Sequence, residues 1–254
     1  LIDATPIGIN VRSTVATYAG VHDELRNIFA RLPQAKEKGY KAGDFSYNTG
    51  SLRCPTCDGT GQISLDVQFL PDVDIPCPDC RGSRYGKEAE AVLYPAPDGK
   101  GYSLPQLMAM DVRQAMEVCS GMKLVRGRLQ VLDSLGLGYL TLGEQTPSLS
   151  GGEAQRLKLA SEMGRPQSDA VFIFDEPTIG LHPLDVRTLL AVFETLIRSG
   201  ATVIVIEHDL DLIRNADYIV DMGPGGGEEG GQIVAAGTPE EVQAAKESVT
   251  GRFL

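Results

Sequence analysis

The spacing of hydrophobic residues changes in the second half of the chain. In the first part, apolar residues recur at helical intervals within residues 22–32 and 104–135, which predicts helices in both stretches. Asp111 is the expected N-cap of a helix in the second stretch, and Gly136 is the expected stop. Elsewhere in this part, including the N-terminus, the pattern predicts extended or looped chain, with a short strand signal at 45–47.

From Leu149 onward, short apolar runs alternate with helical patterns. The expected strands are 171–174, 203–206, 218–220 and 232–235. Helices are expected at 152–163 and from Pro183 to a stop at Gly200. The apolar face of the second of these helices consists of Leu189, Leu190, Phe193, Leu196 and Ile197. Continuous apolar strands that alternate with helices are typical of a parallel sheet covered on both faces, so this part is predicted to be α/β.

Length and composition allow a substantial core. The chain has 254 residues, of which 42% are hydrophobic, and this suffices for one large domain or two smaller ones. No apolar run approaches the roughly 20 residues that cross a bilayer, and the first residues lack the features of a signal peptide. We therefore expect a soluble, cytoplasmic protein without a membrane partner. The missing initial Met indicates a piece of something longer.

Four of the five cysteines form two Cys-x-x-Cys motifs, Cys54 with Cys57 and Cys77 with Cys80. The motifs are separated by 19 residues, a spacing typical of four-thiolate zinc sites. In a chain without a secretion signal, such pairs favour metal over disulfides. The sequence thus predicts one structural zinc, whose four protein ligands leave no position for a catalytic water.

The alternatives to a zinc site are four buried free thiols or two disulfides. Gly59, Gly61 and Gly82 follow the motifs, where tight turns need positive φ. Between the motifs, residues 62–73 alternate polar and apolar as a hairpin would. Cys119 lies on an apolar helix face and is expected in the core. These features favour two metal-binding knuckles joined by a hairpin.

The most specific motif is Leu-Ser-Gly-Gly-Glu at residues 149–153. Ser150 and Glu153 form a capping box at a helix start. Gly151 and Gly152 leave backbone N–H groups bare at the positive end of the helix dipole, which is a ready site for an anion. The pattern alone would also fit an ordinary capped helix. It continues, however, as LSGGEAQRLKLA, which matches the signature of ABC-type ATPases.

An apolar strand that ends in Asp175 and Glu176 follows this motif after about 20 residues. In a Walker B role, Asp175 would hold Mg²⁺ and Glu176 would orient the attacking water. His208, at the end of the next apolar strand, would be the switch histidine that contacts the γ-phosphate. Two carboxylates at a strand end, or a lone histidine, are weak evidence by themselves. The order of the three motifs favours a functional role.

The phosphate-cradling P-loop is missing, because no G-x-x-x-x-G-K-[ST] motif occurs in the sequence. The glycine run at 223–231 is not followed by Lys and Ser or Thr, so it does not replace the P-loop. His182 lies in the loop where ABC ATPases carry a dimer-facing residue, usually Asp. We expect ATP or ADP with Mg²⁺ to bind in a full-length protein, and no hydrolysis by this chain alone.

The chain resembles the C-terminal half of UvrA, the ABC ATPase of bacterial nucleotide excision repair. The likeness rests on a cysteine module placed before LSGGE, which transporter ATPases lack, and it extends over essentially the whole chain. Further matching segments are 2–8, 12–13, 16–18, 39–41, 45–46, 53–54, 69–73, 136–139, 180–183 and 237–241.

The resemblance implies two ATPase modules per chain, a homodimer, binding to damaged double-stranded DNA, and hand-over of damage to a UvrB-like partner. In that family the P-loop that is missing here lies upstream. Carried over by position, the site residues are Cys54, Cys57, Cys77 and Cys80 for zinc, Ser150, Gly151, Gly152 and Glu153 for the signature, Asp175 and Glu176 for Walker B, and His208 for the switch.

The implied fold is the C-terminal part of an ABC-type P-loop NTPase, with an inserted four-cysteine zinc module and a helical signature subdomain. The expected domains are 1–52 as an ABC core segment, 53–87 as the zinc-binding module, 88–147 as the helical signature subdomain, and 148–254 as the ABC ATPase core.

The sequence departs from the family pattern near its start. Ala4 stands where the family usually has the Gln that senses metal and water, and Ile9 replaces an Arg. Two hypotheses follow: a repair ATPase, or a divergent UvrA-like protein for drug or self-resistance that acts mainly by binding. A third, the ATPase of a transporter, is disfavoured by the zinc module and the lack of membrane segments.

Charge limits the kind of DNA contact that this chain can make. The formal net charge is −11, whereas a nucleic-acid-binding surface is expected to be basic. Arg53, Arg81, Arg84 and Lys87 flank the cysteine motifs, among several acidic residues. We therefore expect weak, sequence-independent binding through a few phosphate contacts.

Overall fold

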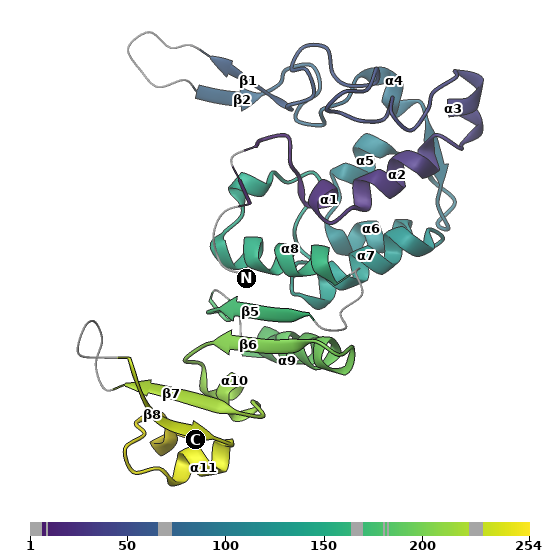
Figure 1. The fold of residues 1–254 in the computed structure, drawn as a ribbon. Coiled ribbons are helices and arrows are strands. Elements are labelled where there is room, and N and C mark those ends of the chain that lie inside the picture. The colour runs from purple at the N-terminus through teal and green to yellow at the C-terminus, as the bar shows by residue number, and fades with distance from the viewer. Residues whose placement is uncertain are drawn as a thin grey trace. The chain divides into compact units, whose positions relative to one another are not determined.

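The computed structural model describes residues 7–8, 10–65, 73–163, 170–179, 181, 183–223 and 231–254. These residues fall into two compact units, 7–163 and 170–254. Figure 1 labels the helices and strands of both.

The first unit is mainly helical. Its helices are α1 (Val15–Tyr18), α2 (Val21–Phe29), α3 (Pro33–Glu37), α4 (Lys87–Glu90), α5 (Leu104–Met108), α6 (Val112–Val118), α7 (Lys123–Ser134) and α8 (Gly151–Glu162), with the 3-10 turn η1 (Thr146–Ser148). Its two antiparallel hairpins are β1 (Gln62–Leu65) with β2 (Val73–Pro76) and β3 (Leu93–Pro95) with β4 (Gly101–Ser103). The predicted hairpin between the cysteine motifs is therefore present.

Side-chain caps decide where several of these helices begin. The Thr14 hydroxyl accepts a hydrogen bond from the Thr17 N–H, so α1 forms where the sequence predicted a loop, and that prediction was wrong there. Asp111 caps α6 as predicted, with its carboxylate 2.7 Å from the Gln114 N–H nitrogen. Gly136, at φ +72°, follows α7 at the predicted stop.

The core of this unit gathers around α2. Leu25 and Phe29 of α2 are fully buried, and Leu104 of α5 and Leu129 of α7 are buried with them. Residues 45–47 form a turn, so the predicted strand there was wrong. The turn buries all three side chains, and the Phe45 ring packs 5.9 Å from the Phe29 ring. These aromatic residues thus contribute core packing rather than strand pairing.

The second unit alternates strands and helices. Its elements are β5 (Val171–Asp175), α9 (Pro183–Arg198), β6 (Thr202–Ile206), α10 (Leu210–Arg214), β7 (Ile219–Gly223), β8 (Gln232–Gly237), α11 (Pro239–Ala244) and the 3-10 turn η3 (Thr250–Arg252). As predicted, β5 and β6 are parallel. Phe172 and Phe174 are buried beneath α9, and the Phe174 ring lies 4.7 Å from the Phe193 ring. Ile197 was predicted to belong to the apolar face of α9, but its side chain is 46% exposed.

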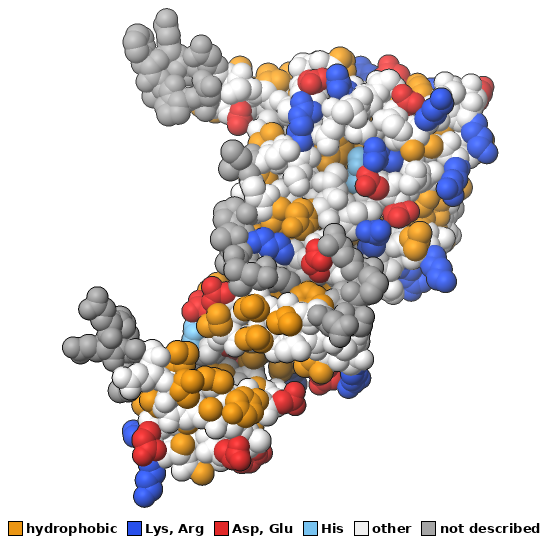
Figure 2. Space-filling model, viewed as in Figure 1, with side chains coloured by type: hydrophobic (Ala, Val, Ile, Leu, Met, Phe, Trp, Pro, Cys, Tyr) orange, Lys and Arg blue, Asp and Glu red, His pale blue; other side chains and the backbone are white. Residues whose placement is uncertain are grey.

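The prediction of one parallel sheet covered on both faces was wrong for the described residues. β7 pairs with β8 in antiparallel fashion, because the eight residues that separate these strands are too few for a parallel crossover of roughly a dozen. On the face of β5 and β6 opposite Phe172 and Phe174, Val171, Ile204 and Ile206 are exposed. Figure 2 shows hydrophobic side chains gathered over these strands.

Among the described residues, no helix is both long and apolar enough to cross a membrane.

Candidate functional site

The fold brings the four cysteines of the two Cys-x-x-Cys motifs to one point. Their sulfur atoms all lie within 4.8 Å of one another. Among the described residues, these four cysteines are the cluster of side chains that could hold a metal ion. The Cys54 and Cys77 sulfurs are 3.9 Å apart, and the Cys57 and Cys80 sulfurs are 3.6 Å apart. Cys119 is buried elsewhere, as predicted.

Local backbone geometry explains why the sulfurs converge. Gly59 and Gly61 have φ near +80°, which permits tight turns after the first motif. A Cβ atom on Gly59 would lie 1.7 Å from the Tyr47 carbonyl oxygen, so only Gly fits there. The Gly61 N–H donates to the Cys57 sulfur, and the Cys77 N–H donates to the Gly61 carbonyl. The first knuckle is therefore bonded directly to the second.

The spacing of the sulfurs fits a tetrahedral cation. Sulfurs about 2.3 Å from a zinc ion would be about 3.8 Å apart along each edge of the tetrahedron, which matches the two distances above. Burial raises the pKa of the Cys80 thiol to about 12. Because a metal-bound thiol must lose its proton, a cation would have to stabilise the thiolate that burial disfavours. The four residues can therefore hold a metal ion, and their donor chemistry suits zinc.

Arg84 has a structural position that sequence reasoning missed. Its side chain is buried, it donates to the carbonyl oxygens of Val11 and Gly59, and its guanidinium lies 5.1 Å from the Tyr47 ring centroid. Burial lowers its pKa. The expectation that Arg84 contacts DNA was therefore wrong, because its donors point inward. Arg81 and Lys87 are exposed.

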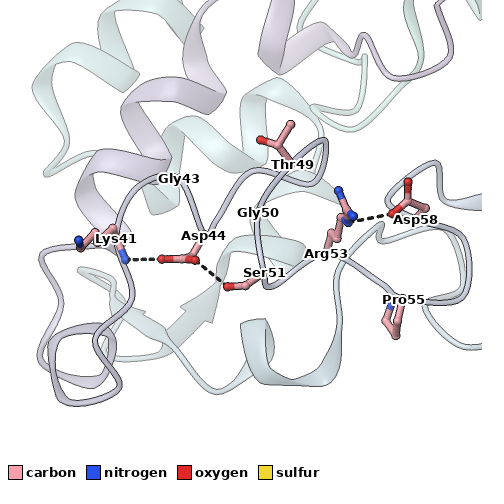
Figure 3. Close-up of a pocket in the computed structure, with 9 residues that line it drawn as sticks. All are labelled: Lys41, Gly43, Asp44, Thr49, Gly50, Ser51, Arg53, Pro55 and Asp58. Atoms are coloured by element: carbon pink, nitrogen blue, oxygen red, sulfur yellow. Dashed lines mark hydrogen bonds and ion pairs between the residues drawn. The ribbon is translucent and has the colours of Figure 1, made fainter.

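A hollow of about 880 Å³ opens beside the first knuckle, and Figure 3 shows its lining. Arg53 pairs with Asp58 at 2.8 Å. On the other side, Asp44 accepts from the Lys41 N–H and the Ser51 hydroxyl. The lining holds two basic residues, Lys41 and Arg53, and two acidic residues, Asp44 and Asp58, so the hollow is not a basic groove.

The signature motif begins α8 as predicted. The Ser150 hydroxyl accepts from the Glu153 N–H, and the Glu153 carboxylate accepts from the Ser150 N–H at 2.7 Å. The second Glu153 oxygen accepts from the Tyr139 hydroxyl. Ser150 is exposed. Because the cap uses only part of the first-turn donors, an exposed helix N-terminus of this kind can receive an anion.

The second group of candidate residues lies where β5 and β6 end. Parallel strands bring their carboxyl ends to the same edge, so Asp175 at the end of β5 and Glu176 directly after it lie at the same edge as His208, which follows β6. The Nδ1 atom of His208 is 3.8 Å from the nearer Glu176 carboxylate oxygen, and the His208 side chain is 80% exposed. Glu176 has φ +46°, a left-handed conformation that is uncommon for residues other than Gly.

Glu207 is a central member of this group that sequence reasoning did not single out. Its side chain is only 2% exposed, and it accepts hydrogen bonds from Thr178, His208 and Asp209. Burial alone would raise the pKa of this carboxyl, but the hydrogen bonds from Thr178 and from the two backbone N–H groups lower it. The sequence signal that could have identified Glu207 was its position directly before His208, the candidate switch histidine.

Ala4, Ile9 and His182 lie outside the described residues, as does most of the glycine run at 223–231. Ser150 belongs to the first unit, whereas Asp175 belongs to the second. The four cysteines form one group and the residues after β5 and β6 another.

Comparisons with known proteins cover the whole chain. It is 49% identical over 254 residues to UvrABC system protein A of Bacillus subtilis strain 168 and 47% identical to that of Staphylococcus aureus strain COL. The crystal structure of UvrA2 from Deinococcus radiodurans matches 99% of the chain and 30% of that protein, with a TM-score of 0.88 and 43% sequence identity. No protein-family model matches.

The matched part is a limited share of these relatives. The chain spans 26% of the length of UvrABC system protein A in both bacteria. The similarity nevertheless covers essentially all of this chain. The sequence identities, 49% and 43%, are high enough to relate the sequences themselves and not only their folds. The chain is therefore a UvrA-related sequence that corresponds, over its whole length, to one region of these longer proteins.

Proposed function

We propose that this chain is the zinc-module and ATPase portion of a UvrA-like DNA-damage-recognition ATPase of nucleotide excision repair. One observation carries the proposal: Glu176 and His208 meet at the shared end of two parallel strands, in a chain that matches UvrA throughout. The fold is then the C-terminal part of an ABC-type NTPase. Its expected domains are 1–52, 53–87, 88–147 and 148–254.

In this proposal each candidate residue has a separate task. Asp175 would hold Mg²⁺ of the bound nucleotide, and Glu176 would orient the water that attacks the γ-phosphate. His208 would contact that phosphate from the neighbouring strand end. The α8 N-terminus begins with exposed Ser150, which forms a capping box with Glu153, followed by half-buried Gly151 and buried Gly152. This helix end would face a nucleotide held by another module. Hydrolysis therefore needs parts outside this chain.

The metal proposal is a single zinc bound by Cys54, Cys57, Cys77 and Cys80. Four converging sulfurs at tetrahedral spacing support it. With four protein ligands, the ion would stabilise the fold of the module and take no part in chemistry. We assign it a structural role only.

The proposed partners follow from the relatives' place in the UvrABC system. They are damaged double-stranded DNA, a UvrB-like protein and a second copy of the full-length chain, in the cytoplasm. The exposed Arg81 and Lys87 are the candidates for phosphate contact near the cysteine module. A specialised role in drug or self-resistance rested on Ala4 and Ile9, and no described residue favours it over repair.

The test uses the full-length protein. The wild type should hydrolyse ATP, and damaged duplex should change the rate. Glu176→Gln should stop hydrolysis but leave nucleotide binding intact, because Gln keeps the shape and loses the charge that polarises water. Loss of binding would instead make Glu176 structural, and a wild type without ATPase activity would refute the proposal.

A further inference from the structure

The buried carboxylate of Glu207 joins the two loops that carry the candidate catalytic groups. One Glu207 oxygen accepts from the backbone N–H of Thr178 at 3.0 Å and from the Thr178 hydroxyl. The other oxygen accepts from the backbone N–H groups of His208 at 2.7 Å and Asp209 at 3.0 Å. One side chain thus bonds the loop after β5 to the loop after β6.

The loop after β5 needs such support, because its backbone is in an unfavourable conformation. Glu176 has φ +46°, and left-handed backbone is costly for a residue with a side chain. Its N–H donates to the Ile206 carbonyl at 2.9 Å, which ties it to the end of β6. Thr178, two residues later, is the next point at which the loop is bonded to the β6 side. The Ile206 carbonyl therefore restrains the backbone of Glu176 directly, and Glu207 restrains the same loop two residues later, at Thr178.

The opposite loop is restrained in the same way. The His208 backbone is bonded to Glu207, whereas the His208 side chain projects into solvent beside Glu176. Asp209 continues the loop and caps α10, with its side chain accepting from the Leu212 N–H at 3.0 Å. Glu176 and His208 thus lie on two loops that are both bonded to Glu207.

We propose that Glu207 is a positioning residue for ATP hydrolysis, which holds the water-orienting carboxylate and the switch histidine at their working separation. The inference rests on the proposed ATPase function. It requires an ionised Glu207, and the hydrogen bonds that lower its pKa favour that state despite burial.

The substitution Glu207→Gln tests the role of the two acceptor oxygens. Gln offers one oxygen where Glu offers two, so it can accept from one loop while its NH₂ group faces the N–H donors of the other. Loss of charge-assisted hydrogen bonds at this point should lower kcat about 10- to 100-fold in the full-length protein. The nucleotide Kd should change less than about twofold, because Glu207 does not contact the nucleotide in this scheme.

Two further variants make the test specific. Thr178→Val removes the hydroxyl that donates to Glu207 and keeps the side-chain shape; it also serves if Glu207→Gln does not fold. In a double-mutant cycle, the effects of Glu207→Gln and Thr178→Val on kcat should be strongly non-additive, because both break the same link. Glu194→Gln is the matched control: this exposed carboxylate on α9 pairs with Arg198 in the same unit, and its loss should leave kcat unchanged.

The outcomes separate this inference from the proposed function. A wild type without ATPase activity refutes the function. An active wild type with an unchanged Glu207→Gln variant refutes the positioning role alone. Parallel losses of kcat and nucleotide affinity, or additive effects in the cycle, also overturn it, because they describe a residue that only stabilises the fold.

Discussion

Acid should weaken the first unit through His22, which is buried in a neutral form. The side chain is 3% exposed, and its Nε2 atom lies 2.7 Å from the Tyr85 hydroxyl oxygen. Because that hydroxyl donates to the Phe45 carbonyl, Nε2 must carry the proton and donate to Tyr85. The ring packs 4.8 Å from the Tyr47 ring. A second proton would place a charge inside this aromatic cluster.

The size and sign of the effect follow from linkage. Burial, with smaller contributions from nearby Arg26 and Arg84, lowers the pKa of His22 from 6.5 to about 3, although Asp23 opposes the shift. The folded state therefore favours neutral His22: its contribution is complete above pH 6.5 and is lost as the pH falls toward 3. Between about pH 7 and about pH 5, the loss is about 2 kcal/mol.

Hydrogen–deuterium exchange of α2 amides in the intact protein measures this loss locally, after correction for the pH dependence of chemical exchange. In His22→Gln, the amide can still donate to Tyr85 but cannot be charged, so opening of α2 should lose most of its pH dependence. Phe29→Leu is the control, because it weakens the same core without removing a titrating group. Equal pH dependence in wild type and His22→Gln would refute the reasoning.

Four further predictions concern the cysteine module and the signature. Cys77→Ser should abolish stoichiometric zinc, measured by metal analysis, and increase exchange in the module while sparing the β5–β6 sheet. Ser150→Arg in the full-length protein should block ATP hydrolysis without weakening nucleotide binding, and an unchanged rate would leave the motif an ordinary capped helix. Arg81→Ala should lower affinity for damaged duplex about equally in all flanking sequences, as titrations at several salt concentrations can show. Arg84→Ala should instead destabilise the module by about 2 kcal/mol in denaturant unfolding, because the buried Gly59 carbonyl and the part-buried Val11 carbonyl lose their donor.

Local rules predicted much of the fold. The caps of α6 and α8, the hairpin between the cysteine motifs and the parallel pair β5–β6 each depend on a short stretch of sequence, and each was confirmed. The failures depend on distant partners. The turn at 45–47 buries its side chains against α2, and β7 pairs with a strand that follows it rather than with β6. Residue spacing alone does not contain that information.

The candidate sites show the same difference between features set by local sequence and features set by distant residues. The Cys-x-x-Cys spacing predicted a convergence that needs only two short turns and a hairpin, and the structure has it. Arg84, in contrast, looks like its exposed neighbour Arg81 in the sequence. Its position depends on Val11, Gly59 and Tyr47, which are up to 73 residues away along the chain. A charge beside a metal knuckle therefore does not identify a DNA contact until its burial is known.

Glu207 and Arg84 together show how charged side chains build this protein's candidate sites. Each is buried and satisfied by hydrogen bonds to the backbone of segments that it joins: Arg84 joins Val11 to the first knuckle, and Glu207 joins the ends of β5 and β6. A buried charge left without partners is strongly destabilising. Removing the backbone partners of either residue should therefore be costly, so these charges favour the one loop arrangement that satisfies them. The side chains of Arg81 and His208, in contrast, are exposed and accessible to a partner.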